Sequence, residues 1–337
     1  MTRRFGLLSS GEAIEQLILE SDSGGLSVSL LTYGATVQSV RAPIAGRWVE
    51  TVVGFDDIAA YEEASTSYLG CIIGRLANRV ARATFRNGNR TYHLTANEGV
   101  NCLHGGARGL SRRVWQALPR RNNTDPIVMH CAAAAGEDGF PGMMRAVVTF
   151  ALADPVSLII HYQVTVDEDC PIDLTHHIYF NLGGRPIEGH LLRISAEQVQ
   201  ELDAEYLATG RTLSVRDTPF DLRTGKPIGQ IAVGQHFQLT AIGLNQNWIL
   251  SNHSQPSCTL ISPDGGLVMD LESDNPCLQV WAGLPRSVFM AGAVALEPQG
   301  YIGAVNHSAF PSPWLRPGEL YERRIIYRFR KAGLVHS

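Results

Sequence analysis

Apolar and polar residues alternate with a period of two in stretches that recur from one end of the chain to the other. Examples are residues 26–40, 156–167, 266–273 and 323–330. Because side chains two residues apart lie on the same face of a strand, this pattern predicts β-strands, some with one wet face and some buried on both. The Asn-Gly pair at 87–88 tolerates the positive φ angles of a tight turn, so it predicts a hairpin.

The pattern gives little evidence for helices. Residues 11–21 place four apolar side chains at helical spacing, but the same segment also fits an early strand, so both interpretations stay open. The sequence contains no internal repeat and no linker rich in Pro, Gly and Ser. The proline-rich stretch at 310–321 precedes a final strand and is interpreted as a rigid surface loop. We therefore expect a predominantly β chain that forms one large domain over residues 1–337.

Composition and charge narrow the classes of ligand. Of the 337 residues, 45% are hydrophobic and 18% are charged, which is typical of a well-packed soluble protein. The formal net charge of −4 argues against a nucleic-acid or anionic-membrane partner, since both usually require a basic excess. No window reaches the roughly 18 to 20 apolar residues that span a bilayer, and the apolar part of the N-terminus is too short for a signal peptide. We expect a cytoplasmic protein for which small neutral ligands remain open.

Four short stretches combine polar groups with glycines or aromatic residues in a way that packing alone does not require. They are GRLANR (74–79), NEGVNCLHGG (97–106), LTHHIYFNLGG (174–184) and ALEPQ (295–299). Each one by itself fits an ordinary loop or surface role. Together they supply two histidines that titrate near neutral pH, a carboxylate, and an Arg-Asn pair that can hold hydroxyl oxygens. This set suits acid–base chemistry on a neutral polar substrate.

The sequence lacks the usual patterns of metal and cofactor sites. His176 and His177 are adjacent, and adjacent strand residues point to opposite faces, so they cannot both line one site. The motifs HExxH, GxGxxG, GxSxG and the P-loop are absent. The six cysteines are widely spaced without a CxxC pair, which predicts reduced packing residues. Metal-dependent hydrolysis, dinucleotide chemistry and serine esterase activity therefore lose support.

The four stretches, in this order and spacing, resemble the aldose 1-epimerase (mutarotase) family, which includes the galactose mutarotases. Further segments extend the resemblance over almost the whole chain, among them GLSVSLLTYGATVQSVRAP, VVGFDD, GEDGFPG and the closing FPSPWLRPGELYERRIIYRF. The resemblance implies an all-β fold, a large antiparallel β-sandwich of the galactose mutarotase-like supersandwich type with few short helices. It also implies an isomerase that interconverts the α and β anomers of a free aldose without a metal or cofactor.

The resemblance also carries roles for individual residues. By matching position, Glu297 resembles the family's general base, His177 its general acid, and His104 the second histidine that meets the substrate. Glu297 would take the proton of the anomeric hydroxyl while His177 protonates the ring oxygen, and reclosure with the roles reversed gives the other anomer. Five further side chains would bind the sugar or share the face of the acid: Asn78, Arg79, Tyr179, Asn245 and Gln279.

The chain departs from the family in the segment GLNQNW, residues 243–248. Asn245 stands where the family usually has an aspartate that contacts sugar hydroxyls, and Gln246 stands in the place of a histidine. The amide of Asn245 lacks the charge and adds two donors, so either its hydroxyl partner is oriented differently or the substrate is a different sugar. Loss of the carboxylate is also expected to lower the pKa of His177. His176 stands where asparagine is common, and we interpret it as a pleat-facing residue bonded outside the site.

Two other functions stay open at this point. A sugar-binding or regulatory protein on the same fold would keep the cleft without turnover, and Asn245 and Gln246 favour it. An epimerase of a phosphorylated or unusual sugar would need groups that meet an anion. A basic cluster offers such groups, although it also fits a solvated surface: Arg108, Arg112, Arg113, Arg120 and Arg121. The sequence does not distinguish a monomer from a homodimer, and it does not identify the preferred sugar.

Overall fold

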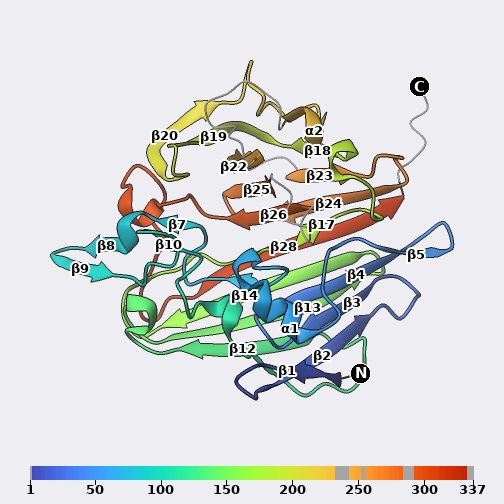
Figure 1. Cartoon of the computed structure of the whole chain (residues 1–337), viewed down its shortest axis with the longest axis horizontal. Helices are drawn as coiled ribbons and strands as arrows, with labels where there is room; N and C mark the ends of the chain where they lie inside the picture. Colours follow the sequence, from blue (N-terminus) through green and yellow to red (C-terminus); the bar gives the residue numbers. More distant parts are fainter. Residues whose placement is uncertain (1, 232–242, 252–255, 284–291, 332–337) are drawn as a thin grey trace.

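Antiparallel strands make up most of the structure, a computed structural model that describes residues 2–231, 243–251, 256–283 and 292–331. The N-terminal sheet follows chain order and lies at the lower right of Figure 1, in blue. Its five strands are β1 (Thr2–Leu7), β2 (Ala13–Glu20), β3 (Ser27–Leu31), β4 (Thr36–Ile44) and β5 (Arg47–Glu50). Most of the segment 11–21, for which two interpretations were open, is therefore a strand, because it contains β2.

A nine-stranded sheet brings the middle of the chain together with its C-terminal strand. The long strands β13 and β14 pair with each other, and β14 pairs with β28. In order across the sheet, the strands are β11 (Gln116–Ala117), β12 (Ile127–Ala133), β13 (Met144–Asp154), β14 (Ser157–Val166), β28 (Tyr321–Lys331), β24 (Leu267–Ser273), β23 (Cys258–Ile261), β18 (Leu191–Ile194) and β21 (Lys226–Pro227).

A six-stranded sheet carries the late polar motifs. It occupies the upper part of Figure 1 and is antiparallel throughout its described pairings. Its strands, in order, are β17 (Tyr179–Phe180), β26 (Val294–Gln299), β25 (Cys277–Gly283), β22 (Gly243–Leu250), β19 (Ala196–Leu202) and β20 (Ala208–Ser214).

Short pairs of strands and a few helical turns connect these sheets. The pairs are β6 (Ile72–Ile73) with β16 (Thr175–His176), β7 (Arg79–Val80) with β10 (Cys102–Leu103), β8 (Thr84–Asn87) with β9 (Arg90–His93), and β15 (Cys170–Pro171) with β27 (Trp314–Leu315). The α-helices in the described ranges are α1 (Ile58–Glu63) and α2 (Ile228–Ile231). Single 3₁₀ turns cover Ser65–Ser67, Ala81–Ala83, Leu110–Arg112, Glu137–Gly139, Ile187–Gly189 and Ala304–Asn306.

The three large sheets share one apolar core. Val28 of β3, Phe150 of β13, Leu278 of β25 and Tyr327 of β28 are buried in the same cluster. The rings of Phe180 and Tyr327 join the six-stranded and nine-stranded sheets, with centroids 5.1 Å apart. Each such side chain stabilises the fold by roughly 1.5–3 kcal/mol when it leaves water. The predicted all-β sandwich with few short helices is confirmed.

Most of the predicted elements lie where the pattern placed them. The stretches at 156–167, 266–273 and 323–330 correspond to β14, β24 and β28, and the Asn-Gly pair joins β8 to β9. The stretch at 26–40 is not one strand, because a turn separates β3 from β4. The proline-rich stretch is largely exposed but contains β27.

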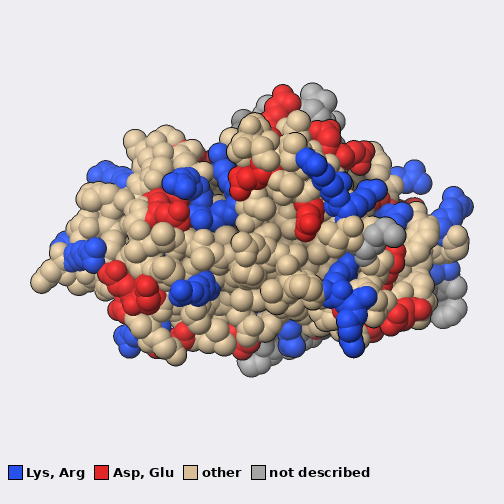
Figure 2. Space-filling view, turned by 90° about the horizontal axis from the view of Figure 1, so that it is seen from below, with Lys and Arg blue, Asp and Glu red and all other residues tan. Residues whose placement is uncertain are grey.

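The cysteines and the charged side chains agree with the expectations from composition. All six cysteines are free, and five of them are buried: Cys71, Cys102, Cys170, Cys258 and Cys277. On the face shown in Figure 2, basic and acidic side chains lie interspersed. None of the helices in the described ranges has the length and apolar character needed to span a membrane.

Candidate active site

The structure brings together the three residues that were predicted to carry the chemistry. One nitrogen of His104, one of His177 and one carboxylate oxygen of Glu297 all lie within 4.8 Å of one another. The closest pair is His177 Nε2 and Glu297 Oε1, which are 3.4 Å apart. All three side chains are buried, so they meet in a site of low dielectric where charge is costly.

His176, the last residue of β16, and His177, which follows it, face opposite ways, as strand geometry predicts. His177 faces Glu297, and its backbone N–H donates to the carbonyl of Cys71. His176 faces the core, where its Nδ1 lies 2.7 Å from the hydroxyl of Tyr162 and its Nε2 lies 3.0 Å from the carbonyl oxygen of Ala35. His176 is therefore bonded outside the site, which confirms the interpretation made from the sequence.

Asn78 and His104 hold each other in place beside the β7–β10 pair. The N–H of His104 donates to the carbonyl of Asn78, and the N–H of Asn78 donates to Nδ1 of the His104 ring. Both residues have left-handed backbones, with φ of 63° and 53°, which residues other than glycine adopt mainly where the surroundings impose it. Because Nδ1 accepts a hydrogen bond, the proton of the neutral ring sits on Nε2. His104 therefore presents an N–H donor to the site.

The Nε2–H tautomer of His104 disfavours metal binding at this cluster. Two histidines and a glutamate form a ligand set that zinc often uses, and the cluster is compact enough to be considered. A metal needs a free lone pair on each imidazole, however, and the backbone N–H of Asn78 keeps the proton on Nε2 of His104. The donor set of this cluster therefore suits a hydroxylated ligand better than a cation.

Burial governs the protonation of the acid–base pair. It raises the pKa of the Glu297 carboxyl to about 8, and the charge of Arg79 opposes the rise. It lowers the pKa of His177 to about 3. The pKa of His104 also lies well below its ordinary value, first because of burial and then because of His177 and Arg79. Near neutral pH the pair of Glu297 and His177 thus holds one proton, and burial places it on Glu297.

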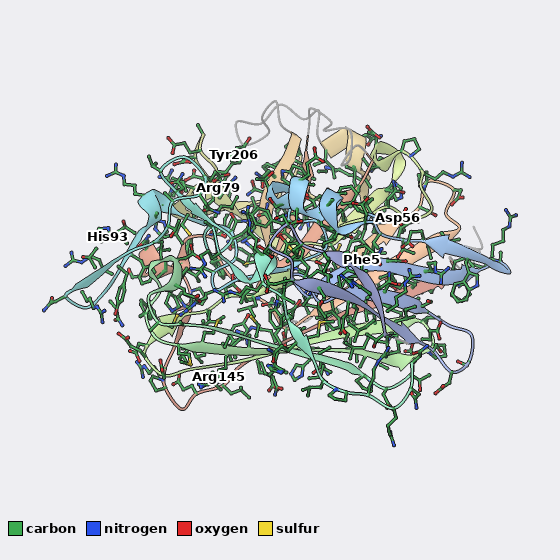
Figure 3. The ribbon with its side chains drawn as sticks, turned by 60° about the horizontal axis from the view of Figure 1, so that its bottom comes forward. Phe5, Asp56, Arg79, His93, Arg145 and Tyr206 are labelled. Carbon is green, nitrogen blue, oxygen red and sulfur yellow. The ribbon has the colours of Figure 1, made fainter. Side chains whose placement is uncertain are left out.

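Arg79 is held rigidly at the edge of the site. Its guanidinium makes two hydrogen bonds of 2.6 and 2.7 Å to the carboxylate of Glu98. It also lies over the ring of Tyr206 at 5.4 Å, and Figure 3 shows these two side chains next to each other. Glu98 belongs to the motif NEGVNCLHGG but was not predicted to act. A guanidinium group that is fixed by a carboxylate offers its remaining N–H groups in one orientation.

Gln279 and Asn245 form a second polar group on the sheet that carries Glu297. Gln279 lies directly across from Glu297, in the register of β25 and β26. Its Nε2 donates to Oδ1 of Asn245 over 2.6 Å. One lone pair of the Asn245 oxygen is used by this bond, and the amide NH₂ adds donors for a ligand where a carboxylate would offer only acceptors. The oxygen Oε1 of Gln279 is buried without a partner among the described residues.

Aromatic rings enclose the histidines. The ring of Tyr179 lies 4.8 Å from that of His177, so the two side chains share one face, and the hydroxyl of Tyr179 donates to the carbonyl of Ser67. The ring of Tyr68 meets His104 edge-on at 4.6 Å and stacks near His177 at 6.1 Å. Tyr68 was not predicted, because its sequence neighbours carry no motif. The rings remove water from both histidines and so contribute to their lowered pKa values.

Comparison with known proteins matches this arrangement to one family. A family model described as Aldose 1-epimerase matches residues 16–328. The chain is 31% identical to the galactose mutarotase of Homo sapiens, over 97% of this chain and 98% of that protein. It is 30% identical to the aldose 1-epimerase of Escherichia coli (strain K12), over 96% of this chain and 97% of that protein. The chain belongs to the aldose 1-epimerase family.

Solved structures of aldose 1-epimerase relatives have the same fold. An aldose epimerase homologue from C. elegans superposes with a TM-score of 0.85 at 29% identity, covering 94% of this chain and all of that one. A galactose 1-epimerase from Lactobacillus acidophilus gives a TM-score of 0.86 at 22% identity, over 99% of both chains. The second likeness, at this identity, supports the fold alone.

Two groups of arginines that the sequence analysis singled out are used elsewhere in the structure. Arg75 of the motif GRLANR does not reach the site, because its guanidinium is buried and donates to backbone carbonyls, including those of Pro141 and Ala134. In the basic cluster, Arg113 pairs with Glu137 at 2.6 Å. Two weaker pairs accompany it, Arg108 with Glu137 and Arg121 with Asp125. Glu137 and Asp125 thus offset part of the charge of this cluster, as ion pairs on a solvated surface commonly do.

Proposed function

We propose that this protein is an aldose 1-epimerase that opens and recloses the ring of a free aldose through Glu297 and His177. The observation that carries the proposal is the 3.4 Å separation between His177 Nε2 and Glu297 Oε1. The anomeric hydroxyl and the ring oxygen of an aldose are attached to the same carbon, so a reaction that moves protons at both oxygens needs a donor and an acceptor side by side. A buried pair that shares one proton meets that need.

The proton balance of the reaction follows from this pair. When Glu297 is ionised and His177 is protonated, Glu297 takes the proton of the anomeric hydroxyl, the bond from C1 to the ring oxygen breaks, and His177 gives its proton to that oxygen. The proton of the pair then sits on Glu297, which is the state that burial favours. Rotation about the bond from C1 to C2 and the reverse transfers close the ring as the other anomer and restore the first state.

The neighbouring side chains have positioning roles in this proposal. His104 offers its Nε2–H to an oxygen of the sugar, and Asn78 fixes the ring that carries this donor. Arg79 stabilises negative character on the oxygens and on Glu297. Gln279 and the NH₂ of Asn245 meet further hydroxyls.

Substitution of the pair tests the proposal. Glu297→Gln and His177→Asn are each expected to slow anomer interconversion by roughly 10² to 10⁴, since each removes one proton-transfer group. His176→Asn is the matched control, because its side chain is bonded in the core, and it should leave turnover unchanged. Polarimetry and proton NMR on freshly dissolved α-D-galactose and α-D-glucose measure the rates. Folded parent protein without acceleration on either sugar would instead support a sugar-binding role.

Several finer properties belong to the same proposal. We propose galactose among the accepted sugars, a cytoplasmic location, and a monomer or homodimer that binds no nucleic acid. We also propose one domain over residues 1–337, which the core shared by the three large sheets supports. A rate series over sugars, cell fractionation, sedimentation and a single cooperative unfolding transition test these properties in turn.

A further inference from the structure

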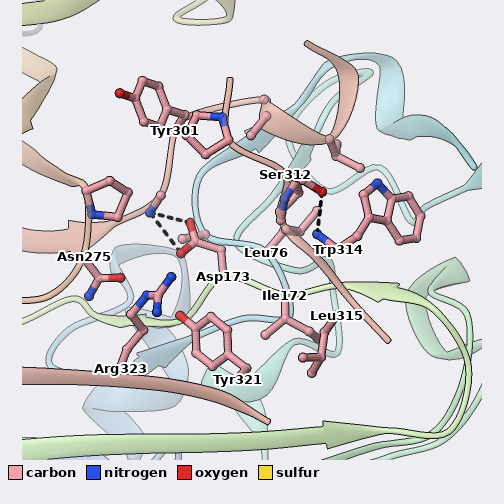
Figure 4. A pocket seen from close by; sticks show the side chains of 18 of the residues that line it. Leu76, Ile172, Asp173, Asn275, Tyr301, Ser312, Trp314, Leu315, Tyr321 and Arg323 are labelled. Carbon is pink, nitrogen blue, oxygen red and sulfur yellow. Dashed lines mark hydrogen bonds between the residues drawn. The ribbon is translucent and has the colours of Figure 1, made fainter. Parts of the chain in front are cut away.

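A second pocket lies beside the site and shares Arg79 with it, where the residues after β15, the turn before β25 and the start of β28 meet the segment that follows β26. It has a volume of about 280 Å³. Exposed lining residues, among them Ser312 and Leu320, show that it reaches the surface. Figure 4 shows side chains from these separate segments turned toward one another. The volume is at the small end of ligand pockets and suits a single sugar ring better than a nucleotide.

The pocket holds a buried hydrogen-bond acceptor that has no partner. The side chain of Asn275 is 3% exposed, and its Nδ2 donates to Oγ of Ser273. Its oxygen Oδ1 is buried without a partner among the described residues. In Figure 4 this oxygen is turned toward the side where Asp173 and Arg323 lie. Because an unpaired buried carbonyl is costly, a donor brought by a ligand would stabilise the site.

Asp173 and Arg323 add a carboxyl group and a guanidinium of opposite charge. Both carboxyl oxygens of Asp173 accept from the N–H of Gly300 at 2.9 Å. Burial raises the pKa of Asp173 to about 7, although the Gly300 N–H and then the charge of Arg323 lower it. Among the described residues, the guanidinium of Arg323 donates to the backbone carbonyl of Glu322. The two opposite charges leave little net field for an ion.

Aromatic and aliphatic side chains form the rest of the wall. Trp314, Leu315, Ile172 and Leu76 line the pocket, as Figure 4 shows. Sugars are recognised by carboxyl, amide and guanidinium groups that bind their hydroxyls, together with apolar surface that packs on their C–H faces. The lining of this pocket has both kinds of group in a space of monosaccharide size.

We propose that this pocket is a second binding site, separate from the cluster of Glu297 and His177, for a neutral polyhydroxy compound of monosaccharide size. Hydroxyl groups of the ligand donate to Asn275 Oδ1 and to Asp173, and Arg323 donates to a hydroxyl or ring oxygen. The site carries out no chemistry. It does not depend on the activity of the first site, so the two can be tested apart.

The indole of Trp314 reports on this pocket. The chain has five tryptophans, so the indole N–H signal of Trp314 in a proton–nitrogen NMR spectrum can be assigned by its loss in Trp314→Phe. Titration with D-galactose and, separately, with D-glucose is expected to move this signal saturably. The movement should persist in Glu297→Gln, which removes turnover only. Binding should become roughly five- to tenfold weaker in Asn275→Leu and in Arg323→Met, because each loses a hydrogen bond to the ligand.

Arg324→Met provides the matched control, since Arg324 is the next residue on β28 and is exposed. It should titrate like the parent protein. A Trp314 signal that neither sugar moves, or that titrates in Asn275→Leu and Arg323→Met with the same affinity as in the parent protein, would overturn the proposal. A signal that sodium acetate moves and the sugars do not would also overturn it, because the ligand would then be an anion.

Discussion

The surroundings of Glu297 and His177 reverse the usual order of proton affinity of a carboxylate and an imidazole. In water a carboxylate is the weaker base of the two, but burial raises the pKa of Glu297 to about 8 and lowers the pKa of His177 to about 3. The pair therefore carries one shared proton over the interval between these two values. Activity should be broad across that interval, with an alkaline limb set by loss of the shared proton and an acidic limb set by gain of a second one.

Arg79 tunes the alkaline limb. Its charge lowers the pKa of Glu297, so Arg79→Met should raise that pKa and move the limb to higher pH. Loss of Arg79 also frees the carboxylate of Glu98, which acts in the same direction. The measurement is kcat/KM against pH for α-D-galactose, with exposed Arg86→Met as the control. A limb that stays in place or moves to lower pH would show that Arg79 does not act on Glu297.

Asn245 tunes the acidic limb. Asn245→Asp places a negative charge in the group that already includes Gln279, beside Glu297 on the neighbouring strand. A negative charge stabilises protonated His177, so its pKa should rise and the limb should move to higher pH. Asn245→Leu removes the amide without adding charge and should not produce this shift. An acidic limb that is the same in the parent and in Asn245→Asp would contradict the prediction.

The loop that delivers His104 depends on a close approach of two backbones. Gly105 has φ of +87°, and a Cβ at this position would lie 2.0 Å from the carbonyl oxygen of Gly74. Gly105→Ala should therefore displace the loop and lower kcat, by roughly 10²-fold if His104 moves by about 1 Å.

Gly99 separates this effect from simple backbone strain. It lies in the same loop with φ of +59° and open space around it. Gly99→Ala should cost roughly 1 to 2 kcal/mol of stability without a comparable change in kcat. Thermal unfolding and polarimetry on the two variants give the comparison. If Gly105→Ala and Gly99→Ala lost kcat equally, backbone strain would explain the loss and the contact with Gly74 would not.

Buried histidines make the stability of the folded molecule sensitive to acid. Burial lowers the pKa of His176 to about 4, below its value of 6.5 in an unfolded chain. Its contribution is therefore complete above pH 6.5 and is lost as the pH falls toward 4, because the unfolded chain then binds a proton that the folded chain does not. Between pH 7 and pH 5 this amounts to about 2 kcal/mol of unfolding free energy.

His176→Asn should reduce the loss of stability between these two pH values by that amount, while His93→Asn on the exposed surface should not. Urea unfolding at pH 7 and pH 5 measures the difference. His104 and His177 have lowered pKa values as well and act in the same direction. An unchanged pH dependence in His176→Asn would mean that burial does not keep this ring neutral.

The sequence alone determined which segments become strands, because a period of two fixes which side chains can face a core. It also determined which groups could meet in the site, since the motifs carry two histidines, a carboxylate and the amides, and adjacent positions forced His176 and His177 apart. Local pattern could not decide between helix and strand for residues 11–21. That segment became β2 because it pairs with β1 and β3.

Only the tertiary structure decided how these groups act. Arg75 and Arg79 stand four residues apart in one motif, yet one is bonded to backbone carbonyls of the fold and the other to Glu98. Tyr68 has no motif and still packs against both histidines. The proton of Glu297 and the tautomer of His104 follow from burial and from one backbone N–H. Contacts between residues far apart in the chain set these properties, and sequence spacing does not encode such contacts.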